Sequence, residues 1–362
     1  MQFIDLKKQY SLIKEDVLKE INEVLDSGQY ILGPKVREFE SVLENYVGVK
    51  HCVGVADGSK ALLIALMALE IKPGDEVIVP AFTFFATASM VALLGATPVF
   101  VDINPKTYNI DINLIEHAIT PKTKAIIAVG LFGQCAQLND INQIAAKHNL
   151  YLIEDAAQSF GSTLNNKKSC SMTTIACTSF FPAKPLGAYG DGGACFTNDD
   201  AIKEKLMWIR VHGQNRHYHH QILGVNGRLD TLQAAVLLAK MRIFPKEVEL
   251  RQQIGQRYCQ LLQGTDCVLP TILNGHTHVF HQFSIQVKNR EEFMAKLKES
   301  GIPTAIHYPI TLNKQPALAK FSLNKVFPVA EAVAERIVSL PMHPYLDEET
   351  QDKIVKIVKQ SL

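Results

Sequence analysis

The sequence predicts an α/β fold in which a large lobe with a mainly parallel sheet precedes a smaller α+β lobe. Between about residues 50 and 200, short apolar segments rich in branched side chains alternate with longer helical patterns. Alternation at this spacing is typical of βαβ units, whose parallel strands are covered by helices on both faces. The chain of 362 residues also exceeds a single typical core, so two lobes are expected.

The expected strands can be read in order along the first lobe. They are "CVGVA" (52–56), "EVIVP" (76–80), "PVFVDI" (98–103), "AIIAVGLF" (125–132) and "LYLIEDAA" (150–157). Ligands of such sheets bind where parallel strands end, at the carboxyl edge. The informative residues fall at that edge, at 57–59, 82–85 and 155–158.

The pattern changes after residue 209. The segment 210–228, "RVHGQNRHYHHQILGVNGR", is polar, aromatic and glycine-rich, and it is expected to be a long excursion from the core. A helix is predicted over 229–244, followed by a charged helix that leads into the smaller lobe. We therefore divide the chain into a large domain, 1–245, with an N-terminal helix, and a small domain, 246–362.

Composition excludes several classes of protein. Lys and Arg number 37 against 36 Asp and Glu, so the chain lacks the basic excess of a nucleic-acid binder. Its N-terminus is charged too early for a signal peptide, and no apolar run approaches the roughly 18 residues of a membrane span. Seven cysteines without CxxC spacing favour reduced thiols. We expect a cytoplasmic protein without nucleic-acid or membrane partners.

Lys184 stands in an unusual setting, the stretch "TSFFPAKPLGAYGDGGA" (178–194). A lysine whose stem lies on apolar surface while its amine reaches water is the commoner reading of such a position. Partial desolvation would instead lower the lysine's pKa and supply the neutral amine that Schiff-base chemistry requires. A carboxylate elsewhere in the chain favours the second reading.

Asp155 ends the apolar strand "LYLIED" and precedes small residues that would let a flat group lie close to the backbone. An acid after a strand is often only a turn residue or a helix N-cap. An aspartate at this edge could also keep a pyridine nitrogen protonated, which is what pyridoxal phosphate chemistry depends on.

A phosphate anchor is then expected where a loop enters a helix. Gly58 and Ser59 stand at such a point, where free backbone N–H groups and the helix dipole favour an anion. Ser179 could add a hydroxyl, and Phe84 or Phe85 could cover a ring face, although core packing is commoner for such residues. No metal site is expected from the histidines of the 210–228 segment.

Together these motifs resemble the DegT/StrS-type nucleotide-sugar aminotransferases, which are fold-type I pyridoxal phosphate enzymes. The resemblance extends almost end to end and includes "GQYILGPKVREFE", "GVADGSKALLIALMAL", "EDAAQSFG", "SFFPAKPLGAYGDGGA", "GVNGRLDTLQAA" and "SLPMHPYL". It implies an aspartate aminotransferase-like fold with a seven-stranded sheet, pyridoxal 5'-phosphate as cofactor, and a homodimer with its active sites at the interface.

The resemblance also assigns residue roles. Lys184 corresponds to the lysine that binds the cofactor covalently, Asp155 to the partner of the pyridine nitrogen, and Gln158 to an amide near the ring oxygen. The remaining cofactor contacts implied are Gly58, Ser59 and Ser179 to the phosphate, Phe84 to the ring, and Asn226 to the phosphate of the neighbouring subunit. The segment 210–228 would then be an arm across the dimer.

Within this family, the sequence motifs most resemble those of the branch that acts on UDP-2-acetamido-2-deoxy-3-oxo-glucuronate. That resemblance implies that L-glutamate donates the amino group and that the product serves surface polysaccharide (O-antigen) biosynthesis. Arg228, His307 and Tyr308 correspond to residues near the sugar carboxylate, and a guanidinium suits that group. Three alternatives stay open: an aminotransferase for a 4-keto nucleotide sugar, a dehydratase, and a non-catalytic sensor. Members that act as dehydratases carry histidine in place of the lysine, which this chain keeps.

Overall fold

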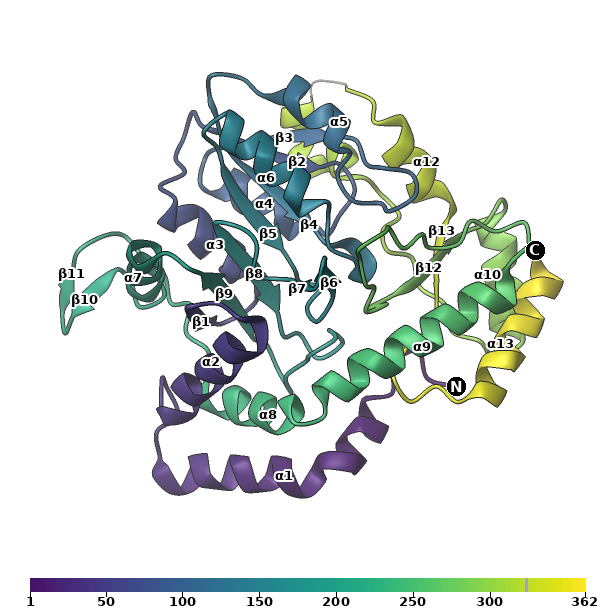
Figure 1. Ribbon diagram of the computed structural model, residues 1–362, viewed down its shortest axis with the longest axis horizontal. Helices are drawn as coiled ribbons and strands as arrows, with labels where there is room; N and C mark the ends of the chain where they lie inside the picture. Colours follow the sequence, from purple (N-terminus) through teal and green to yellow (C-terminus); the bar gives the residue numbers. More distant parts are fainter. Residues whose placement is uncertain (323–324) are drawn as a thin grey trace.

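The computed structural model describes residues 1–322 and 325–362, and a seven-stranded sheet lies at its centre (Figure 1). The strand order is β1-β9-β8-β5-β4-β2-β3. The strands are β1 (His51–Val55), β2 (Glu76–Pro80), β3 (Thr97–Val101), β4 (Thr123–Val129), β5 (Tyr151–Asp155), β8 (Ile175–Ser179) and β9 (Gly193–Thr197). Within this sheet only β9 runs antiparallel to its neighbours, β1 and β8. The predicted mainly parallel, seven-stranded sheet is confirmed.

Helices cover both faces of the sheet because successive strand residues point to opposite sides. In β4, Ile127 enters one core, shared with α3 and α4, while Ile126 enters another, shared with α6. The helices of this lobe are α1 (Leu6–Ser27), α2 (Pro34–Val47), α3 (Gly58–Ala68), α4 (Ala86–Leu93), α5 (Ile112–Ile115), α6 (Leu138–Lys147), α7 (Asp200–Ile209) and α8 (Thr231–Met241), with 3₁₀ turns at Glu116–Ala118 and Leu131–Gly133.

The helix predicted over 229–244 is shorter than expected. It is α8, which ends at Met241, and α9 (Phe244–Leu262) begins two residues after Arg242 with Pro245 in its first turn. Proline fits there because the first helical N–H groups have no partner within the helix. The proposed division at 245/246 thus falls inside the start of α9, which runs from α8 toward α10 and α13 (Figure 1).

The segment after α9 builds a second core. The strands β12 (Phe283–Gln286) and β13 (Ile337–Leu340) pair antiparallel, and α10 (Arg290–Glu299) and α13 (Glu348–Ser361) pack with them and with α9. In contrast, α12 (Pro328–Arg336) places Ala330 and Val333 in the core of the large sheet. Shorter elements are α11 (Ala319–Ser322) and the 3₁₀ turns Leu312–Lys314 and Pro316–Leu318. The second core thus includes most, but not all, of the elements after residue 246, and the division into 1–245 and 246–362 remains our proposal.

Two hairpins complete the fold. One is short, β6 (Thr163–Leu164) with β7 (Lys167–Lys168). The other, β10 (Gln214–Arg216) with β11 (His219–His220), lies in the predicted excursion and projects from the end of the molecule opposite to α10 and α13 (Figure 1). Among the described residues, no helix combines the length and the apolarity that crossing a membrane requires.

Candidate active site

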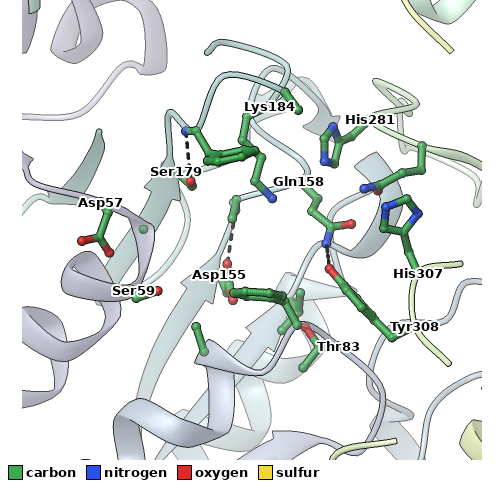
Figure 2. A pocket seen from close by; sticks show the side chains of 18 of the residues that line it. Asp57, Ser59, Thr83, Asp155, Gln158, Ser179, Lys184, His281, His307 and Tyr308 are labelled. Carbon is green, nitrogen blue, oxygen red and sulfur yellow. Dashed lines mark hydrogen bonds between the residues drawn. The ribbon is translucent and has the colours of Figure 1, made fainter. Parts of the chain in front are cut away.

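One cavity of about 450 Å³ opens at the carboxyl edge of the sheet (Figure 2). The residues predicted from sequence that line it are Gly58, Ser59, Phe84, Asp155, Gln158, Ser179, Lys184, His307 and Tyr308. The sheet supplies this convergence, because β1, β2, β5 and β8 all end at this edge. Asn226 and Arg228 belong to the predicted set but are not among the described residues around this cavity.

Lys184 lies in the turn that follows β8. Its backbone N–H donates to the carbonyl of Phe181 at 2.8 Å, and the carbonyl of nearby Gly187 accepts from the buried ammonium of Lys240 at 2.6 Å. The Lys184 residue is half-buried because the cavity opens beside it. Burial lowers the pKa of its amine to about 8, and the Asp155 carboxylate acts in the opposite direction. Neutral amine is therefore available at mildly alkaline pH.

Asp155 is the last residue of β5, and its carboxylate is held at both oxygens. The Thr87 hydroxyl donates to Oδ2 at 2.9 Å and the Ala157 N–H donates to Oδ1 at 3.2 Å. Burial raises the pKa of Asp155, while these two hydrogen bonds and the Lys184 cation oppose the rise. The carboxyl group is thus fixed in direction by the strand end and by α4.

The start of α3 lies against the end of β8. Asp57 caps the helix by accepting from the Lys60 N–H at 2.8 Å. A Cβ on Gly58 would lie 2.6 Å from the Cβ of Ser179, so only glycine permits this approach. The N-terminal N–H groups of α3 and the Ser179 hydroxyl therefore face one end of the cavity together.

Gln158 joins the sheet edge to the opposite side of the cavity. Its Oε1 accepts from the Phe132 N–H at 2.8 Å, and its Nε2 donates to the Tyr308 hydroxyl at 3.1 Å (Figure 2). An amide nitrogen carries two protons, so one of them remains for a ligand. We call the side formed by Asp155, Gln158, Ser179 and Lys184 the sheet wall.

The side formed by His281, Gln282, His307 and Tyr308 is the C-terminal wall. His307 Nδ1 lies 2.9 Å from the Ser339 hydroxyl, and burial together with the Lys184 cation lowers the pKa of His307 to about 4. Burial raises the pKa of Tyr308. Both side chains are therefore neutral near pH 7.

Sequence reasoning missed several cavity residues. These are Phe3, Ile4, His281 and Gln282, together with Thr87, which orients Asp155. Their segments carry ordinary strand and turn patterns, so no local signal separated them from core residues. Only the tertiary arrangement brings the N-terminus and the segment before β12 to the carboxyl edge of the sheet.

Asn226 and Arg228 lie at the base of the projecting hairpin, where Asn226 is exposed and Arg228 half-buried. Arg228 forms an isolated antiparallel bridge with Val55, and its Nε is buried without a hydrogen-bond partner in the described chain. In the parts of the chain that the structure describes, no cluster of three or more potential metal ligands occurs.

Comparison with known proteins agrees with this geometry. The model of the DegT/DnrJ/EryC1/StrS aminotransferase family matches residues 11–359. This chain belongs to that family. A UDP-2-acetamido-2-deoxy-3-oxo-D-glucuronate aminotransferase from Pseudomonas aeruginosa is 54% identical over 96% of each chain. A UDP-N-acetyl-3-dehydro-alpha-D-glucosamine 3-aminotransferase from Acidithiobacillus ferrooxidans is 44% identical over 99% of this family member and 97% of the relative.

Solved structures give the same assignment. An aminotransferase of the family from Brucella abortus superposes with a TM-score of 0.97 at 44% identity, over 99% of both chains. DesV from S. venezuelae superposes with a TM-score of 0.97 at 36% identity, over 99% of this chain and 97% of DesV. NtdA from Bacillus subtilis, solved with bound PMP, gives 0.90 at 32% identity, over 99% of this chain and 83% of NtdA. The predicted fold-type I architecture and the predicted enzyme class are confirmed.

Proposed function

We propose that this family member transfers the amino group of L-glutamate to the 3-keto group of UDP-2-acetamido-2-deoxy-3-oxo-glucuronate. The product is UDP-2-acetamido-3-amino-2,3-dideoxy-glucuronate. The observation that carries the proposal is the placement of Lys184 and Asp155 on one cavity, with the pKa of the lysine lowered to about 8. The Pseudomonas relative supports the choice of sugar.

The enzyme uses pyridoxal 5'-phosphate, and the cavity residues fit that cofactor. An anion-binding end is present at the start of α3 beside Ser179, and a fixed carboxylate is present at Asp155. Phe84 is 52% exposed and offers an open ring face beside the cavity. When bound, the cofactor supplies an aldehyde that condenses with amines and a ring that accepts electrons as a neighbouring C–H bond breaks.

The chain's own residues then perform three tasks. Asp155 would keep a proton on the pyridine nitrogen, and Lys184 would be the residue that holds the cofactor covalently. Its amine, once free, would remove the α-proton of glutamate as a general base and, in the second half-reaction, would deliver a proton to C3 of the sugar. Its lowered pKa lets the same group accept and donate near neutral pH.

We further propose that two copies of the chain form each site. Asn226 and Arg228 are not among the described residues that line the cavity of their own chain, and they follow a hairpin that projects from the body (Figure 1). A partner's arm would bring Asn226 to the cofactor phosphate and Arg228 to the sugar carboxylate. The buried, unpartnered Nε of Arg228 supports a ligand at that guanidinium.

Direct product analysis tests the activity. Incubation with L-glutamate and UDP-2-acetamido-2-deoxy-3-oxo-glucuronate should give the 3-amino sugar by mass spectrometry, with one 2-oxoglutarate formed for each sugar aminated. Release of ammonia in place of 2-oxoglutarate would show a dehydratase. Amination of 4-keto sugars alone would contradict the proposed substrate.

Mixing two inactive variants tests the shared site. Lys184→Ala and Arg228→Ala homodimers should each be inactive toward the uronate, but a mixed dimer retains one intact site if Arg228 acts across the interface. Random exchange of subunits should then restore about a quarter of wild-type activity. No recovery, with exchange shown by native mass spectrometry, would place Arg228 in its own subunit's site.

A further inference from the structure

His281 is a buried polar residue of the cavity for which the proposed chemistry has no role. It precedes β12, is only 5% exposed, and lines the cavity together with Lys184. Figure 2 shows its imidazole on the same side of the cavity as the Lys184 side chain. Its Nδ1 is fully enclosed and has no hydrogen-bond partner within residues 1–322 and 325–362. A buried histidine with an unsatisfied ring nitrogen thus lies beside the reacting lysine.

The surroundings of His281 determine the charge of its ring and which ring nitrogen carries the proton. Burial and the charges of Lys184 and Arg251 lower its pKa well below the ordinary value, so the ring is neutral. A neutral imidazole carries one N–H and one lone pair. An enclosed N–H without an acceptor is rare in proteins, and an enclosed acceptor lone pair is less so. The lone pair therefore belongs on Nδ1, which leaves the N–H on Nε2, at the edge of the ring that reaches the cavity.

We propose that His281 is a positioning residue that donates from Nε2 to a substrate oxygen on or beside the carbon that exchanges the amino group. The proposal rests on the proposed transamination. Lys184 must reach that carbon in both half-reactions, and His281 lines the same cavity on the same side as Lys184 (Figure 2). Glutamate presents a carboxylate there and the sugar presents neutral oxygens, so one neutral donor can serve both substrates, whereas a charged group would favour one.

Three variants distinguish the effect of the N–H donor of His281 from the effect of its aromatic ring. His281→Phe keeps the ring and removes the donor. His281→Gln places an amide N–H near the position of Nε2, and His281→Asn places it near the enclosed Nδ1. The matched control is His343→Asn. His343 is 6% exposed, and its Nδ1 is likewise buried without a hydrogen-bond partner among the described residues. It is not among the described residues that line the cavity.

Single-turnover rates measure the effect. With cofactor bound to the same occupancy, His281→Phe and His281→Asn should slow both half-reactions about tenfold, the loss of one hydrogen bond to substrate. His281→Gln should return both rates to within about threefold of wild type, and His343→Asn should stay within the same range. Equal losses in the Gln and Phe variants, a loss in one half-reaction alone, or no loss would each overturn the proposal.

Two further readouts keep the result interpretable. The glutamate half-reaction is followed by 2-oxoglutarate release without any sugar, so it tests His281 even if the proposed keto-uronate is not the acceptor. Nitrogen NMR of histidine-labelled protein, with His281→Gln to assign the signal, should show the Nε2–H form of a neutral ring. A protonated ring or an Nδ1–H form would contradict the argument independently of activity.

Discussion

The two walls of the cavity differ in how completely the protein satisfies their polar groups. On the sheet wall, Asp155 receives two hydrogen bonds and Gln158 uses both ends of its amide. On the C-terminal wall, His281 and Gln282 each carry a buried polar atom with no partner in the described chain. The sheet wall is therefore fixed before any substrate arrives, as expected for groups that hold a cofactor, while the C-terminal wall keeps hydrogen-bonding capacity for substrates.

The difference follows from the origin of the residues. On the sheet wall, Asp155 and Ser179 end strands, where backbone pairing determines their positions, and Gln158 and Lys184 follow those strands directly. The C-terminal wall comes from the segment before β12 and from the segment between α10 and the 3₁₀ turn Leu312–Lys314, where Tyr308 packs against the core of the large sheet. We therefore expect substitutions on the C-terminal wall to change substrate selection more than they change the chemistry at the sheet wall.

The largest expected effect comes from the centre of the sheet wall. Lys184→Ala should reduce turnover at least about a thousandfold, because the covalent attachment point and the general base are both lost. The absorbance of the bound cofactor should change as well. Lys168→Ala is the control, since Lys168 also has a pKa lowered by burial and does not appear among the described cavity residues. Retained amino transfer in Lys184→Ala would show that the sheet wall does not carry out the chemistry.

Adjacent carboxyl groups offer a sharper test of the sheet wall. Asp155→Asn should lower turnover roughly a hundredfold, because a neutral amide cannot balance a protonated ring nitrogen. Glu154→Gln should keep turnover within about threefold. Glu154 is buried on the other side of β5, where it accepts from the Ser169 hydroxyl and the Cys170 N–H, and burial raises its pKa to about 7. Equal losses in both variants would point to damage to the strand instead of a role for Asp155.

The hydrogen bond between the walls should matter less. Tyr308→Phe removes the acceptor of Gln158 Nε2 while keeping the ring, so kcat should fall about fivefold, the usual effect of one neutral hydrogen bond. The binding of cofactor, followed by titration of the apoenzyme, should be unchanged. A loss as large as that in Asp155→Asn would mean that the two walls act as one unit.

The last prediction concerns stability instead of catalysis, and it is measured on the apoenzyme. The pKa of Lys184 is lowered from 10.5 to about 8, so below pH 8 the folded protein holds a desolvated cation. Between pH 8 and 10.5 the unfolded chain binds a proton that the folded chain does not, so wild-type stability rises with pH relative to a variant without this group. Lys184→Met should be more stable by up to about 3 kcal/mol at pH 7, and this advantage should shrink toward pH 10. A pH-independent difference in urea unfolding would contradict the lowered pKa.

Much of the sheet wall could be predicted from the sequence because its residues follow apolar strands directly. Asp155 and Ser179 end strands, and Lys184 follows in a distinctive turn. His281 and Gln282 could not be predicted in this way, because their burial depends on packing between distant segments. The helix expected to end at 244 was too long, since the chain turns after Met241 before α9 begins. Asn226 and Arg228 depend on a second chain, which remains a proposal.

Borohydride reduction of the cofactor-loaded enzyme, followed by peptide mass spectrometry, tests the central claim most directly. The account predicts that the reduced cofactor is attached to Lys184 alone and that Asp155→Asn leaves the attachment site unchanged. Attachment to another lysine, such as the buried Lys240, or the absence of any covalent adduct would contradict it.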